Sequence, residues 1–211
     1  MTQKLASLYL IESKTQLRVQ AELHQGISEL SLKQFESAWI PAMRELQPKI
    51  ALQYGNTTYG AQHQHWDWRK FQKEFSGLLA YTSYSITVNG VGEAFMWLAD
   101  APIGRRAKLP GQVGKDLVYV EYLSAAPWNL LIPNVQIPRY KGTGAVLMKA
   151  AVTKSMQLGY KGRVGLSALP QSTEFHARFL TRVGPDAHNS RLEYFESSEH
   201  AAKRMVEEGT P

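Results

Sequence analysis

One short segment limits this chain more than any other. The stretch RYKGTG at residues 139–144 follows a strand interrupted by proline and leads directly into a helix predicted to run to Leu158, with Gly159 at its stop position. The first N–H groups of a helix have no partner inside it, and the helix dipole places partial positive charge there. A helix start that carries glycines therefore favours an anion such as a diphosphate, and Arg139 and Lys141 add positive charge beside it.

Taken alone, these glycines also fit an ordinary turn at a helix start. A Rossmann loop requires a third glycine at a defined spacing, and a Walker loop ends in Gly-Lys-Ser/Thr; this segment has neither. The flanking elements must therefore decide what the segment does.

Hydrophobic period and turn residues predict a mixed order of helices and strands. Ser31 opens a capping box for a helix that Pro41 kinks or ends, and Asp67 caps a helix that ends near Tyr81. Asn89-Gly90 predicts a hairpin. Strands are predicted at residues 5–12, 84–88, 93–98, 117–123, 163–168 and 192–195, later helices at 143–158, 170–183 and from 198, and loops at 50–64, 100–114 (with Pro102) and 126–138.

Composition narrows the class of protein. The 211 residues include no cysteine, which excludes disulfides and thiolate chemistry and predicts a reducing, cytoplasmic compartment. No stretch approaches the ~20 apolar residues of a membrane span, so no membrane role is expected. The net charge of +6 favours anionic partners, but its basic residues are spread along the chain rather than gathered in a block, which disfavours nucleic acid.

With its flanks, the segment resembles the acetyl-CoA signature of the GNAT superfamily of N-acetyltransferases, Gln/Arg-x-x-Gly-x-Gly/Ala, matched by Arg139, Gly142 and Gly144. The resemblance spans about residues 84–184. It implies an α/β (α+β) fold with a mixed, mostly antiparallel central sheet, splayed strands and flanking helices. It also implies a single domain over residues 1–211: a variable acceptor-side part at 1–83, the acetyl-CoA-binding core at 84–184, and a C-terminal strand and helix at 185–211.

The activity implied by the resemblance is transfer of an acetyl group from acetyl-CoA to a primary amine, by direct attack in a ternary complex and without a metal. The strand before the signature splays from its neighbour in that family, which leaves backbone groups to hydrogen-bond the pantetheine arm. The residues implied to bind acetyl-CoA are Leu123, Ser124, Ala125, Arg139, Tyr140, Lys141, Gly142, Thr143, Gly144, Ala145, Gln171 and Phe175.

Two residues are candidates for proton transfer. Glu121 lies where the family often keeps a carboxylate that deprotonates the amine; an exposed strand glutamate is the other interpretation. The family's Phe-Tyr pair, whose tyrosine protonates the departing thiolate, is replaced here by Phe175-His176. His176 is therefore the candidate acid, with a purely structural histidine as the alternative. The asparagine often found before that helix is also missing, and Gln171 is the nearest polar residue.

The acceptor is predicted to be a small-molecule or peptide amine, and a homodimer is compatible with the sequence. The detour at residues 126–138 is longer than usual in the family, so Trp128 is predicted to wall the substrate pocket, together with Tyr122 and Trp66. His63 and His65 lack a third ligand at a recognised spacing, which argues against a metal site. Two other functions stay open: an acyl-CoA-binding module without catalysis, and a basic nucleic-acid-binding domain.

Overall fold

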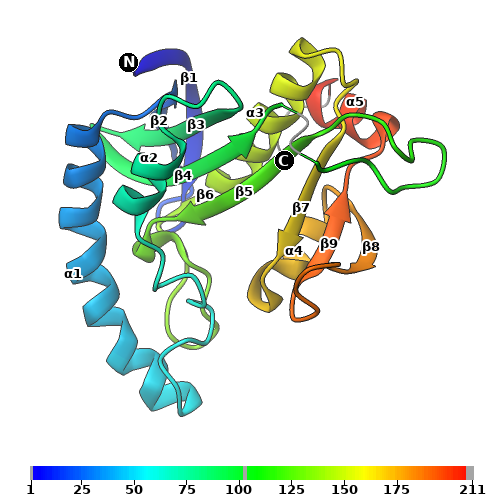
Figure 1. The fold of residues 1–211 in the computed structure, drawn as a ribbon. Coiled ribbons are helices and arrows are strands. Elements are labelled where there is room, and N and C mark those ends of the chain that lie inside the picture. Colours follow the sequence, from blue (N-terminus) through cyan, green and yellow to red (C-terminus); the bar gives the residue numbers. More distant parts are fainter. Residues whose placement is uncertain (1, 102–103, 208–211) are drawn as a thin grey trace. The chain divides into compact units, whose positions relative to one another are not determined.

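The computed structural model describes residues 2–101 and 104–207 (Figure 1). In this part of the chain the strands form one mixed, mostly antiparallel sheet in the order β6-β1-β2-β3-β4-β5-β7-β9-β8, which confirms the predicted fold class. The strands are β1 (Gln3–Glu12), β2 (Arg18–Gln25), β3 (Tyr81–Val88), β4 (Val91–Ala99), β5 (Val118–Ala125), β6 (Tyr140–Lys141), β7 (Val164–Ala168), β8 (Thr181–Pro185) and β9 (Glu193–Glu196). The helices are α1 (Glu29–Tyr54), α2 (Trp68–Phe75), α3 (Thr143–Gln157), α4 (Thr173–Ala177) and α5 (Glu199–Glu207).

The chain builds two compact units, and each draws on separate stretches of sequence. The first contains the chain up to Gly77, Ser83–Phe95 and Leu123–Gly144; the second contains Leu78–Thr82, Met96–Tyr122 and the chain from Ala145. The division at residues 83 and 184 that the resemblance implies stays a prediction.

In the first unit, α1 is longer than its sequence suggests. Its N-cap is Ser28, whose hydroxyl accepts a hydrogen bond from the N–H of Ser31 at 3.0 Å, so the predicted cap at Ser31 was three residues late. Pro41 does not end the helix, which continues past Pro48 to Tyr54. A proline removes one helical hydrogen bond, and burial of an apolar stripe on both sides of it outweighs that loss. The ribbon of α1 bends along its length (Figure 1).

Aromatic side chains pack α1 and α2 on the sheet of the first unit. The ring of Trp68 lies edge-on to Trp39 of α1 and to Phe95 of β4, with ring centres 6.2 and 4.9 Å apart. Trp39 Nε1 donates to the carbonyl of Gly92 at 2.9 Å. A Cβ on Gly92 would lie 2.5 Å from the ring of Phe35, so only glycine allows α1 to approach β4 this closely.

The helix capped by Asp67 begins as predicted, with the Asp67 carboxylate accepting from the N–H of Lys70 at 2.9 Å. It ends at Phe75 rather than near Tyr81. Gly77 has φ +83°, a left-handed conformation that stops the helix, and Leu79 beyond it is fully exposed. The Asn89-Gly90 hairpin is confirmed, with φ of +49° and +78° at its two turn residues.

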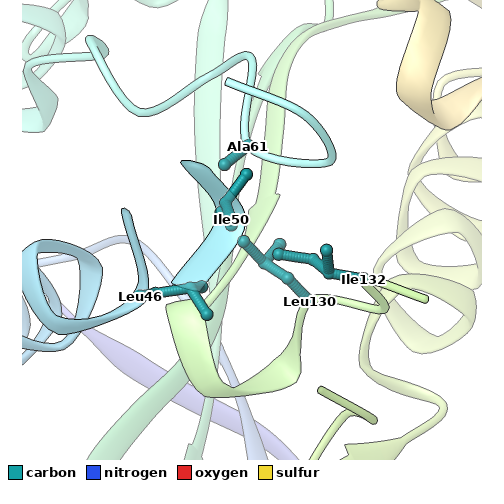
Figure 2. Packing of buried hydrophobic residues seen from close by; sticks show 5 residues of the cluster. All are labelled: Leu46, Ile50, Ala61, Leu130 and Ile132. Atoms are coloured by element: carbon teal, nitrogen blue, oxygen red, sulfur yellow. The ribbon is translucent and has the colours of Figure 1, made fainter. Parts of the chain in front are cut away.

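The detour at residues 126–138 is irregular, as predicted, and packs on the second half of α1. Figure 2 shows the cluster that holds it, in which Leu130 and Ile132 of the detour meet Leu46, Ile50 and Ala61. Tyr54 Oη also donates to the carbonyl of Pro133 at 2.6 Å. The cluster ties the detour to the helix and the loop that precede α2.

In the second unit, β5 pairs in parallel with β7, while β7 and β8 flank β9 in antiparallel fashion. The helix predicted at residues 170–183 is only partly present: a 3-10 turn at Pro170–Ser172 is followed by the short α4, and Thr181 already belongs to β8. Pairing of Thr181 with Glu196 explains the difference. β9 is an available pairing partner for this segment, and the spacing of apolar residues within the segment cannot predict such a partner.

The loop between β4 and β5 is anchored by a buried carboxylate. Glu196 accepts hydrogen bonds from the backbone N–H groups of Lys108 and Leu109, at 2.7 and 3.3 Å, and from the side-chain amide of Gln112. The glutamate is completely buried, so these donors offset the cost of its burial. The predicted loop is therefore anchored at residues 108–112; Pro102 lies outside the described residues.

Candidate functional site

The signature segment has the strand–glycine–helix geometry expected from the sequence. Tyr140 and Lys141 form β6, which pairs antiparallel with Glu12 and Ile11 of β1. The carbonyl of Arg139 accepts from the N–H of Ser13 at 2.8 Å. α3 begins directly afterwards, at Thr143. Pairing with β1 thus fixes the direction in which the chain enters the helix.

Gly142 is the turning point of this segment. Its φ is +101°, a conformation that side-chain-bearing residues rarely adopt, and a Cβ there would meet only Leu10 Cδ2 at 3.6 Å, an ordinary contact. The demand for glycine therefore comes from the backbone. Residues 142 and 144 thus carry no Cβ at the start of α3, which is the backbone pattern that an anion site at a helix start requires.

A buried carboxylate that sequence analysis did not single out is linked to the signature segment through hydrogen bonds. Glu93 of β4 is 1% exposed, and its Oε2 accepts from Trp128 Nε1 and from Asn129 Nδ2, both at 2.6 Å. Asn129 Oδ1 in turn accepts from the backbone N–H of Tyr140 at 2.9 Å. A charged residue inside the apolar strand GEAFMWLA was the available signal, because an isolated buried charge needs partners.

The electrostatics of this network follow from its burial. Burial raises the pKa of Glu93, while the hydrogen bonds from Trp128 and Asn129 and the charge of Arg139 act in the opposite direction. Burial also raises the pKa of Tyr140, and the negative charge of Glu93 adds to that effect.

Trp128, predicted to wall the substrate pocket, has contacts that tie it to the signature. Its backbone carbonyl accepts from the N–H of Arg139 at 2.8 Å, and the guanidinium carbon of Arg139 lies 5.6 Å from the centre of its ring. The indole thus positions the arginine. Trp66 lies in the aromatic cluster of α2, 5.6 Å from Trp68 between ring centres. The substrate-binding roles of both tryptophans stay predictions.

The pairing of β5 with β7 stops early. Its register runs from Val118 opposite Val164 to Val120 opposite Leu166, although β5 continues to Ala125. Leu123, Ser124 and Ala125 thus lie beyond the last of these pairs. This agrees with a strand that splays, while contact of these three residues with a ligand stays a prediction.

Glu121 lies on β5 in the second unit, just past the last pair, with a side chain 16% exposed. Its Oε2 lies 3.5 Å from Nη2 of Arg105. On the same strand, Tyr119 Oη donates to the hydroxyl of Ser167 at 2.8 Å. Tyr122 is half-buried. Glu121 is therefore neither free in solvent nor deeply buried, which suits a group that exchanges protons with a ligand.

His176 differs from the expected acid. It lies in α4 and is 5% exposed, with its ring centre 4.9 Å from that of Phe175 and 6.2 Å from that of Phe195. Burial lowers its pKa to about 4, and the nearby charge of Arg178 adds to the shift. At pH 7 only about one imidazole in a thousand would then carry the proton that an acid must deliver. These surroundings favour the structural interpretation. Gln171, predicted to contact the cofactor, lies in the preceding 3-10 turn.

The two histidines of the HQH segment point to different surroundings. His63 is buried against Trp66, and its pKa is lowered to about 4, mainly by burial, whereas His65 is exposed. Within residues 2–101 and 104–207, no three His, Cys, Asp or Glu side chains cluster as a metal site would require. None of the helices in that part of the chain is long and apolar enough to cross a membrane.

Comparison with known proteins identifies the architecture. No family model and no curated protein matches the sequence. The GNAT domain of PAT from S. lividans is similar in structure, with a TM-score of 0.54 at 12% identity over 90% of this chain and 94% of that one. FeeM, an N-acyl amino acid synthase from uncultured soil microbes, gives a TM-score of 0.52 at 12% identity over 88% and 94% of the two chains.

The chain has the GNAT fold. Identities this low concern the architecture, so the chemistry of this GNAT-fold chain must be argued from its own residues. The resemblance drawn from residues 139–144 is confirmed at the level of the fold.

The Glu93 network yields a test of how the signature is held. Asn129→Leu removes the acceptor for the Tyr140 N–H and one donor to a buried carboxylate, so the free energy of unfolding should fall by about 2–3 kcal/mol. In a Glu93→Leu background, the loss of unfolding free energy caused by Asn129→Leu should be smaller by at least ~1 kcal/mol. The reason is that no buried carboxylate is then left short of a donor. Urea denaturation of the four proteins measures both values. Additive losses would show that Glu93 and Asn129 act independently.

The buried histidines give the GNAT-fold chain a defined acid sensitivity. An unfolded histidine titrates near pKa ~6.5, above the folded value of about 4 for His176, so the unfolded state binds the proton first and stability falls as pH drops below about 6.5. By pH 5 this should remove about 2 kcal/mol. In His176→Phe, the difference in unfolding free energy between pH 7 and pH 5 should shrink by about that amount. His188→Gln, at an exposed position, is the control and should leave the difference unchanged; equal pH dependence in all three proteins would contradict the assignment.

Proposed function

We propose that this chain is an acyltransferase that moves an acyl group, acetyl in the first instance, from a coenzyme A thioester to a primary amine. The observation that carries the proposal is the backbone turn at Gly142, which is followed at once by the start of α3 and flanked by two exposed cations, Arg139 and Lys141. FeeM, which shares the fold, is described as an N-acyl synthase, so amine acylation is compatible with this architecture.

The residues present fit the diphosphate of coenzyme A. The N–H groups of Thr143, Gly144 and Ala145 occupy the first turn of α3, where helix geometry leaves them without helical acceptors. A diphosphate there would also meet the positive end of the helix dipole. The guanidinium carbon of Arg139 lies 5.6 Å from the ring centre of Trp128, and the backbone of Lys141 is paired with Ile11 of β1, so both cations extend from a fixed backbone beside the helix start. We assign the pantetheine arm to the backbone of Leu123, Ser124 and Ala125.

The bound thioester would supply an activated acyl carbon, so no nucleophile is required of the protein. What the chain must do is keep the amine close and uncharged. We propose Glu121 as the group that accepts the amine's proton. His176 is left out of this scheme because it is neutral at pH 7 and buried among aromatic rings.

A non-catalytic acyl-CoA-binding module is the second candidate. It is favoured by the surroundings of His176, which leave the position of the family's tyrosine without a group that is protonated at neutral pH. Both candidates require binding of coenzyme A, and only the first requires release of its thiol.

Cofactor binding tests both candidates. Acetyl-CoA at a hundredfold excess over its Kd should stabilise the protein by about 2.7 kcal/mol, seen as a rise in Tm. Gly142→Asp should abolish this rise, because a side chain and a negative charge would then stand at the anion-binding helix start. Gly159→Asp is the matched control at the other end of α3: its glycine has φ +79° and open space around it, so backbone strain is similar and binding should persist. An unchanged rise in Gly142→Asp would leave the segment as a simple turn.

Catalysis is tested by thiol release from acetyl-CoA with a panel of amines. Glu121→Gln should lower turnover at neutral pH more than it lowers acetyl-CoA affinity, and the loss should shrink as pH rises because free amine then becomes abundant. Turnover equal to that of the unmodified protein across the pH range would remove Glu121 from the mechanism. Binding without thiol release from any amine would favour the non-catalytic module.

A further inference from the structure

A cation lies directly beside the proposed base. Nη2 of Arg105 lies 3.5 Å from Oε2 of Glu121, and the guanidinium carbon lies 3.6 Å from the centre of the Tyr119 ring. One face of the guanidinium is therefore packed on an aromatic ring, and one edge faces a carboxylate. This arrangement fixes the plane of the guanidinium and leaves its edges as the route by which a ligand can reach it.

The guanidinium keeps most of its hydrogen-bonding capacity. A guanidinium has five N–H donors, and in the described part of the chain its ion-pair partner is Glu121, at a distance longer than the ~2.7–2.9 Å of a strong charged hydrogen bond. The Arg105 side chain is 37% exposed. Burial would raise the pKa of Asp186, but hydrogen bonds from the hydroxyl of Ser167 and from two backbone N–H groups of its own turn lower it, and the charge of Arg105 adds a smaller lowering.

The loop holds this arginine in place. Two residues further on, Ala107 is buried with Leu117 and Tyr119, and its N–H donates to the carbonyl of Lys115 at 2.9 Å. The next residues are bound by the buried carboxylate of Glu196. A guanidinium carried by an anchored loop loses little entropy when it binds a ligand, which is what a recognition residue requires.

We propose that Arg105 and Glu121 together select an α-amino acid as the acceptor, with the ligand's carboxylate on Arg105 and its amine at Glu121. This rests on the proposed function, which places the reacting amine at Glu121. In an α-amino acid the nitrogen and the carboxyl carbon are only about 2.5 Å apart, so one ligand can contact both protein groups, whose nearest atoms lie 3.5 Å apart. The four groups then alternate in sign. Arg105 is the specificity-determining residue, because amines without an adjacent carboxylate leave its donors unused.

Binding of α-amino acids can be measured without acyl transfer. Saturation-transfer NMR with a pool of proteinogenic α-amino acids, and in parallel with the corresponding amino acid amides, is recorded in the presence of CoA. We expect the acids to bind the unmodified protein and Arg105→Gln to weaken that binding on the order of 10-fold to 100-fold, as loss of a charged hydrogen bond predicts. Arg106→Gln is the matched control: it removes the same charge from the neighbouring residue, which pairs with Asp116, and should bind as before.

Arg105→Lys keeps the charge without the planar fork and should give an intermediate loss. If Arg105→Gln fails to fold, the comparison of acids with amides on the unmodified protein still decides. Equal binding of acids and amides, or equal binding by Arg105→Gln and Arg106→Gln, overturns the proposal. If thiol release is as fast with amides as with acids, the chain transfers acyl groups but Arg105 does not select α-amino acids, and the proposal is overturned. Acid binding that depends on Arg105 without thiol release from any amine supports it while acyl transfer falls.

Discussion

The buried carboxylate of Glu93 is the interaction on which the signature segment depends. A charge at 1% exposure is tolerated only where donors reach it, and both side-chain donors here come from consecutive residues of the detour, Trp128 and Asn129. The same asparagine holds the backbone of Tyr140, and the same tryptophan lies under Arg139. The strand that carries Glu93 thereby determines where the chain turns into α3. An apolar residue at position 93 would remove both side-chain hydrogen bonds and leave only the backbone carbonyl of that residue to accept from the N–H of Ala126 and from Asn129 Nδ2.

Local sequence signals predicted the elements that local physics controls. The hairpin at Asn89-Gly90, the cap at Asp67 and the strand–glycine–helix order around Gly142 each depend on a few neighbouring residues, and each is present. Predictions failed where distant packing outweighed propensity. α1 passes through Pro41 because residues on both sides of it bury apolar side chains. β2 was not predicted although Val19, Ala21 and Leu23 alternate with polar residues along it; its pairing with β1 and β3 depends on residues far away in the sequence.

The residues of the candidate site also divide into those that neighbouring residues determine and those that distant contacts determine. The glycines of the signature could be found because the turn into α3 demands a particular backbone, with φ +101° at Gly142, and such a demand is visible in residue types. Glu93 and Arg105 could not be assigned, because what matters about them is which distant residues they contact. The sequence also could not predict the environment of His176. A histidine between phenylalanines has the same sequence pattern whether its ring faces a ligand or the core, and burial in the core is what lowers its pKa.

The interleaving of the two units has a consequence for synthesis. The first unit needs three separate stretches of the chain, and the last of them ends at Gly144, at the end of the signature. While the chain emerges from the ribosome, the β1–β2 pair and α1 are available early but lack the detour that packs on α1. The turn at Gly142 is thus the last part of its unit to be synthesised. A nascent chain stalled before residue 126 would lack Leu130 and Ile132 and so leave Leu46 and Ile50 of α1 uncovered, the kind of apolar surface that chaperones bind.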